Sequence, residues 1–242
     1  MQTEIFQMSV EAVGADDGRN TYEIRRKWGD GGKKSLVVEL YPTLSTDMCG
    51  KMDLSTMHLL NHAEELGWSE IRIVNLYSRV FAVKPTASQL EEDAENLSYI
   101  ETILEEEDIR EYDLVIAWGN TLLNHQNTIH AKIDLLSMMK EKGLVNQVKC
   151  IITDSLDSYG VHPLYLGLRY ANDKWKLGKY PVEKILKELE GGGDKAEKGK
   201  GKTAGDKANS RKGEKKSLNN DKEVKNLSDK ARKGAKENVP EN

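Results

Sequence analysis

The feature that most constrains the fold of this chain is the alternation of short apolar runs with longer amphipathic segments. The apolar runs span residues 35–40, 71–76, 113–118 and 148–153. Each has the length and composition of a buried β-strand, and the segments between them repeat apolar residues at helical spacing. Strands separated by helices pair in parallel and are covered by helices on both faces. The sequence therefore predicts a three-layer α/β domain with a central, mainly parallel four-stranded sheet.

An additional strand is expected near the N-terminus. Residues 21–28 and 35–40 both have strand character, and they flank the segment Gly29-Asp30-Gly31-Gly32. Glycine-rich segments between two strand-like runs are typical of β-hairpin turns. We therefore expect these two runs to pair as an N-terminal hairpin.

The composition changes abruptly at Gly191. Residues 191–242 hold 15 Lys and Arg against 9 Asp and Glu, a net charge of +6, and almost no large apolar residues. Such a segment cannot bury enough surface to offset its ordering entropy. The sequence predicts a domain at 1–190, with 21 Lys and Arg against 31 Asp and Glu, followed by a disordered basic tail at 191–242. The acidic domain is not the pattern expected of a nucleic-acid-binding protein, but the tail offers positive charge to polyanions.

Several classes of protein are not indicated by this composition. Cys49 and Cys150 are the only cysteines, so no disulfide framework, zinc knuckle or four-thiolate iron–sulfur site is expected. His58 and His62 share a helical face, but Leu59 stands where the metalloprotease signature has glutamate. We therefore expect no metal and no cofactor. The first residues lack signal-peptide character and no run reaches transmembrane length, which predicts a cytoplasmic protein with no membrane partner.

Each of the four strand-like runs is followed by a loop with polar or proline-containing chemistry. In chain order the motifs are LVVELYPTLSTD (36–47), IVNLYSRVFAV (73–83), LVIAWGN (114–120) and HPLYL (162–166). Ligands of parallel sheets bind at loops beyond the carboxyl ends of the strands. We therefore expect these motifs to line one cleft.

Taken in this order, the motifs resemble an uncharacterised prokaryotic domain family, domain of unknown function 1643, with the consensus LNPSTAD, VVNLFAYRA, AWG and HPLYL. That pattern is in turn similar to the uracil-DNA glycosylase superfamily, whose members carry GQDPYH, LLLN followed by LTV, LLWG and HPSPLS. The resemblance covers roughly residues 20–170. It implies a uracil-DNA-glycosylase-like fold and a DNA glycosylase that flips out a pyrimidine base and excises it, leaving an abasic site. DNA is then the partner, and we expect a monomer.

The resemblance also implies roles for individual residues. Asn75 corresponds to the asparagine that recognises the edge of the base, since its amide offers both a donor and an acceptor. His162 corresponds to the histidine that donates a hydrogen bond to the base carbonyl as negative charge builds there. The glycosylase pattern has Asp or Asn immediately before its proline, where this chain has Tyr41. Asp47 matches the aspartate of LNPSTAD and is the candidate for the group that directs water or stabilises the sugar cation.

The residue after the proline bears on the substrate. In the glycosylase pattern it is a tyrosine that excludes bases with a 5-substituent, whereas here it is the smaller Thr43. With Tyr41, Thr43 is assigned to the base pocket, and the smaller side chain favours a pyrimidine enlarged at C5. Hydroxymethylated or glucosylated cytosine of phage DNA fits this description and implies antiviral defence. The remaining expected DNA contacts are Pro42, Ser45, Arg79, Pro163 and Tyr165.

Two alternatives remain open. The first is a non-catalytic module of the same fold that binds a nucleotide or single-stranded DNA. The second is a different hydrolase or transferase, because a fold does not fix a function. Whether a carboxylate reaches the sugar separates the first alternative from a glycosylase. Whether Asn75 and His162 converge on one pocket separates the second.

Overall fold

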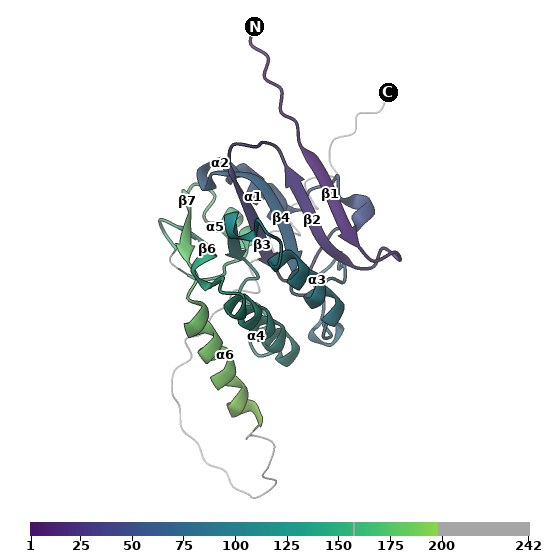
Figure 1. Cartoon of the computed structure of the whole chain (residues 1–242), viewed down its shortest axis with the longest axis vertical. Helices are drawn as coiled ribbons and strands as arrows, with labels where there is room; N and C mark the ends of the chain where they lie inside the picture. Colours follow the sequence, from purple (N-terminus) through teal and green to yellow (C-terminus); the bar gives the residue numbers. More distant parts are fainter. Residues whose placement is uncertain (157, 198–242) are drawn as a thin grey trace, which may run out of the picture. The chain divides into compact units, whose positions relative to one another are not determined.

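The computed structural model describes residues 1–156 and 158–197. These residues form one mixed β-sheet flanked by helices (Figure 1). The strands are β1 (Ser9–Gly14), β2 (Thr21–Lys27), β3 (Lys33–Glu39), β4 (Trp68–Asn75), β5 (Tyr112–Ile116), β6 (Val148–Thr153) and β7 (Trp175–Lys179). The α-helices are α1 (Leu54–Asn61), α2 (Ala63–Leu66), α3 (Ala94–Leu104), α4 (Gln126–Glu141), α5 (Pro163–Arg169) and α6 (Val182–Glu197). The short 3₁₀ turns are η1 (Thr46–Met48), η2 (Ala87–Gln89), η3 (Ile109–Glu111) and η4 (Val145–Gln147).

The strand order is β1-β2-β4-β3-β5-β6-β7. The four central strands β4, β3, β5 and β6 are parallel, as the sequence predicts, while β2 and β7 join them antiparallel on either side. The chain enters the centre at β3, moves outward to β4, and returns to β5 on the other side of β3. The order of strands therefore reverses between β3 and β5, which makes this the topological switch point of the sheet.

The expected hairpin between residues 21–28 and 35–40 is wrong in its pairing. Both runs are strands, but β4 lies between them: β2 pairs with β4 antiparallel and β3 pairs with β4 parallel. The glycines of the link serve a close crossing over the start of β4, because a Cβ on Gly32 would lie 2.8 Å from Ser69 N. The N-terminal hairpin is instead formed by β1 and β2.

Alternation along the strands divides the interior into two apolar clusters. Leu36 and Val38 of β3 point to the face that α3, α4 and α6 cover, and Val37 points to the face that α1, α2 and α5 cover. Asp53 caps α1 by accepting a hydrogen bond from Thr56 N, the role its position ahead of an amphipathic run predicts.

The C-terminal boundary differs from the sequence prediction. Helix α6 begins at Val182 and ends at Glu197. It therefore continues beyond the boundary that the sequence places after Glu190. Val182 and Leu186 are buried against the sheet, which explains why the helix is held there. The remainder of the tail predicted at 191–242, from residue 198 onward, lies outside the described residues.

Candidate active site

Two polar side chains lie side by side where β3 and β4 end. Glu39 and Asn75 are register partners across the parallel pair, so they project from the same face of the sheet, the face of Val37 and Ile73. They are 5% and 4% exposed. Glu39 Oε1 and Asn75 Oδ1 are both buried, and neither has a hydrogen-bond partner among the described residues. Two buried polar atoms without a partner at the carboxyl edge of a sheet are costly for the fold unless a ligand or a water molecule satisfies them.

His162 comes to the same place from α5. It is the N-cap of that helix, immediately before Pro163, and its Nδ1 accepts a hydrogen bond from Leu164 N at 3.3 Å. In the neutral imidazole the proton must then be on Nε2, which lies 4.0 Å from Glu39 Oε2. Gly119, with φ 76°, permits this approach, because a Cβ there would lie 3.1 Å from the His162 Cβ. The loops after β3 and β5 thus meet α5 at the switch point.

Burial sets the protonation of the pair. Desolvation raises the pKa of Glu39 well above its usual value, and the nearby Asp53 carboxylate raises it further. Desolvation lowers the pKa of His162 to about 4, an effect that Asp53 opposes. At neutral pH the imidazole is therefore uncharged, and it can donate a hydrogen bond without transferring a proton.

The first loop is tied to α1 through Asp53. Thr43 Oγ1 donates a hydrogen bond to Asp53 Oδ2 at 2.6 Å, while the other oxygen of Asp53 caps the helix. Thr43 itself is exposed. Tyr41 is turned to the other face, where it joins the cluster under α3 and α4 and packs edge-on against Phe81, with ring centroids 5.8 Å apart. The Tyr41 ring therefore does not fill the space beside Thr43.

Asp47 lies elsewhere. It is exposed in η1, which packs against the edge strand β1, and its carboxylate accepts a hydrogen bond from Ser45 Oγ. No hydrogen bond or ion pair joins it to Glu39 or His162 among the described residues. The carboxyl group that the structure brings to His162 is Glu39, which sequence reasoning missed. The available signal was a charged residue at the end of the apolar run LVVEL.

The other expected contacts are distributed around this edge. Pro42 is buried and its carbonyl accepts a hydrogen bond from Phe81 N, so it shapes the backbone. Arg79 is exposed, with its guanidinium over the Phe81 ring. Pro163 is buried as the first residue of α5, and Tyr165 on the same helix is 46% exposed. Of these four residues, Arg79 and Tyr165 are thus the two that are exposed to solvent.

Within residues 1–156 and 158–197, no group of three or more His, Cys, Asp and Glu side chains could hold a metal ion. His58 instead packs its ring against Gly167 of α5, where a Cβ would lie 2.2 Å from the ring. No helix in these residues combines the length and the apolar character needed to cross a membrane.

The fold and site define a doubly wound α/β protein with a buried polar cluster at its switch point. The chain belongs to the family described as "protein of unknown function (DUF1643)", whose family model matches residues 21–164. This span contains Glu39, Asn75 and His162. Comparison with curated proteins finds no match, and comparison with solved structures finds none.

Proposed function

We propose that this protein is a DNA glycosylase that flips out a pyrimidine nucleotide and hydrolyses its N-glycosidic bond, leaving an abasic site. The observation that carries the proposal is the convergence of Glu39, Asn75 and His162 on one face at the switch point. The order of the four motifs, which resembles that of uracil-DNA glycosylases, supplies the reaction class. A carboxyl group, an amide and a neutral imidazole are the groups this reaction needs.

The departing base would be held by Asn75 and His162. Cleavage develops negative charge on the base and oxocarbenium character on the sugar. Asn75 Oδ1, which has no partner in the described structure, would accept from the base edge, as recognition of a flipped base requires. His162 Nε2–H would donate to the carbonyl oxygen where charge accumulates. Because the imidazole is neutral, it stabilises that charge as a hydrogen-bond donor.

Glu39 would act on the sugar side, in the role that the sequence assigned to Asp47. A buried carboxylate beside a developing cation stabilises it, and a carboxyl group with a raised pKa is a stronger base toward water once it is ionised. Glu39 lies two residues before Tyr41. It would take the role of the Asp or Asn that glycosylases carry immediately before the proline. Ionisation of Glu39 therefore becomes a requirement of the reaction.

The substrate we propose is a pyrimidine enlarged at C5, such as the hydroxymethylated or glucosylated cytosine of phage DNA, which gives the protein an antiviral role. Two observations support this choice. Thr43 is a small side chain held against Asp53, and Tyr41 packs away from it against Phe81. A pocket wall without an aromatic ring leaves room for a 5-substituent.

A second candidate is a binding module of the same fold that recognises a flipped or single-stranded base without chemistry. The observation that favours it is that burial keeps Glu39 protonated well above the usual pH range of a carboxyl group. A protonated Glu39 serves as a hydrogen-bond donor to a bound base and does not activate water.

Abasic-site formation distinguishes these candidates. The purified protein is incubated with uracil-containing, unmodified and C5-modified DNA, and the abasic sites are cleaved with alkali. We expect cleavage of the C5-modified DNA by the native protein and by Asp47→Asn, and its loss in Glu39→Gln. Efficient release of plain uracil alone would contradict the enlarged pocket. Binding without cleavage of any of these DNAs would favour the binding module.

A further inference from the structure

The end of β4 is held by the first turn of α3, on the face of the sheet opposite to the Glu39 side chain. The register between β2 and β4 ends at the pair Glu23 and Val74. The next carbonyl, that of Asn75, instead accepts a hydrogen bond from Asn96 Nδ2 at 2.7 Å. The Asn96 side chain therefore takes over from a strand partner at the residue where the candidate active site begins.

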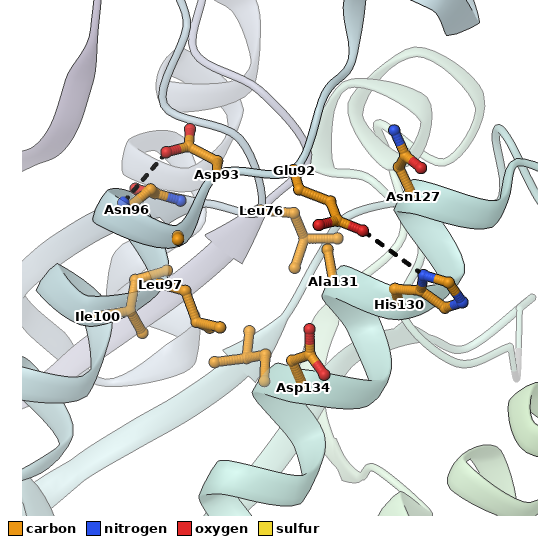
Figure 2. Close-up of a pocket in the computed structure, with 12 residues that line it drawn as sticks. Leu76, Glu92, Asp93, Asn96, Leu97, Ile100, Asn127, His130, Ala131 and Asp134 are labelled. Carbon is orange, nitrogen blue, oxygen red and sulfur yellow. Dashed lines mark hydrogen bonds and ion pairs between the residues drawn. The ribbon is translucent and has the colours of Figure 1, made fainter.

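The same turn also holds the residues that follow Asn75. Figure 2 shows Asp93 and Asn96 joined at the start of α3. Asp93 Oδ1 accepts from Asn96 N at 3.1 Å, and Asp93 Oδ2 accepts from Ser78 N at 2.8 Å and from Ser78 Oγ at 2.7 Å. The segment 75–78 is thus bonded to α3 at both of its ends.

This segment joins two sides of the candidate active site. Leu76 N donates a hydrogen bond to the Glu39 carbonyl at 3.0 Å, and Tyr77 N donates to the Leu40 carbonyl at 3.1 Å. The backbone that carries the Asn75 side chain is therefore bonded to the backbone that carries Glu39. A displacement of the segment would change the positions of both side chains.

The burial of Asn96 is tied to this one side-chain bond. The residue is only 1% exposed, and its Oδ1 is buried with no hydrogen-bond partner among the described residues. A buried acceptor without a partner lowers the stability of the fold. An apolar side chain at this position would avoid that cost, but it would leave the Asn75 carbonyl without its donor. The gain from Asn96 is therefore the fixed position of the strand end.

We infer that Asn96 is a positioning residue of the candidate active site, which fixes the Asn75 side chain by holding the Asn75 main-chain carbonyl. Asn96 reaches β4 from the face that α3 covers, whereas the Asn75 side chain lies with Glu39 on the other face. Asn96 therefore acts through Asn75. The consequence for catalysis rests on the proposed function, in which Asn75 recognises the edge of the base. The positioning itself is measured without a substrate.

Hydrogen–deuterium exchange of the full chain tests the positioning. Asn96→Ala removes the donor, and Asn96→Asp keeps the size of the side chain but replaces the amide donor by a carboxylate. Asn127→Ala is the matched control, because Asn127 Nδ2 makes the same kind of bond, at 3.0 Å, to the Leu90 carbonyl from the facing helix α4 (Figure 2).

The amides of residues 76–78 should exchange about tenfold faster or more in both Asn96 variants and at the native rate in Asn127→Ala, because only the Asn96 variants loosen this strand end. If Asn96→Ala does not fold, Asn96→Asp decides. Native exchange rates in the folded Asn96 variants would overturn the inference, and so would an equal increase in Asn127→Ala.

A double-mutant cycle on base release tests the link to Asn75. Well below the melting temperature, Asn96→Ala should lower the single-turnover rate about tenfold or more, because a small displacement of a positioned group is costly. In the Asn75→Ala background the same change should alter the rate less than about twofold, since its effect passes through Asn75. A purely structural role would give equal effects in both backgrounds, and that result would overturn the inference. If the native protein releases no base, the proposed function fails, and faster exchange in the Asn96 variants still supports the positioning of Asn75.

Discussion

His162 Nε2 lies 4.0 Å from Glu39 Oε2, although the two residues come from opposite ends of the domain sequence. Burial favours the uncharged form of both groups, so their interaction is that of a neutral imidazole and a carboxyl group at rest. Each group would change its charge state only when the pH passes its pKa, or when a bound ligand alters its electrostatic environment and thereby its pKa. Together with Asn75, the register partner of Glu39 on β4, this pair is the basis of the predictions on catalysis and pH dependence.

Loss of either side chain that we propose to contact the base, Asn75 or His162, should slow base release while the fold survives. We expect Asn75→Ala and His162→Ala each to lower the single-turnover rate by about 10²-fold or more, as when other transition-state hydrogen bonds are removed. Asp47→Asn is the matched control, because Asp47 is exposed and separate from the cluster. Rates unchanged in both alanine variants, at unchanged melting temperature, would remove these residues from the mechanism.

Glu39→Gln should stabilise the folded protein at neutral pH. The raised pKa of Glu39 means that its contribution to stability is fully present below the pKa of an unfolded glutamate and is lost as pH rises through the folded value. Glutamine cannot ionise and avoids this loss. In thermal unfolding, the melting temperature of Glu39→Gln should rise relative to that of the native protein as pH rises from 4 to 8. About 1 kcal/mol corresponds to roughly 2–4 °C for a domain of this size. A difference independent of pH would contradict the buried carboxyl group.

His162 should give the opposite dependence. Its folded pKa of about 4 lies below the ordinary value, so the stability it contributes is present above pH 6.5 and is lost as pH falls toward 4. Replacing it in His162→Asn should remove this loss. Relative to the variant, the native protein should therefore lose stability between pH 6.5 and 4. Because His162 and Glu39 lie close together, the double variant is needed to separate their contributions.

The C-terminal segment should contribute to DNA affinity through charge. Residues 198–242 hold 14 Lys and Arg against 7 Asp and Glu. Truncation after Glu197, which retains α6, should weaken DNA binding and reduce its dependence on salt, because fewer counterions are released. Binding is measured as a salt titration, with melting temperature as the check on folding. An unchanged salt dependence would assign DNA binding to residues 1–197 alone.

The sequence predicts the central strands well because they are buried on both faces and their apolar runs are continuous. Which strands pair with one another is harder to predict from the sequence, as the link at residues 28–32 shows. It can extend up to about 16 Å, whereas strands two positions apart lie about 10 Å apart, so the same glycines permit a hairpin or a crossing over β4. Asn75 and His162 could be singled out as candidates because they lie in distinctive motifs. Glu39 could not, since a glutamate at the end of a strand is ordinarily a solvated residue, and only the fold shows its burial.

The pH dependence of single-turnover base release by the native protein and by Glu39→Gln tests the central claim most directly. We predict that the native rate on C5-modified DNA rises with pH through one ionisation, with a midpoint above the ordinary value for glutamate, because Glu39 must lose its proton to act. In Glu39→Gln the rate should fall by about 10²-fold or more and the rising limb should disappear. A Glu39→Gln variant that retains the native rate and the same pH profile would contradict the assignment of Glu39 as the catalytic carboxyl group.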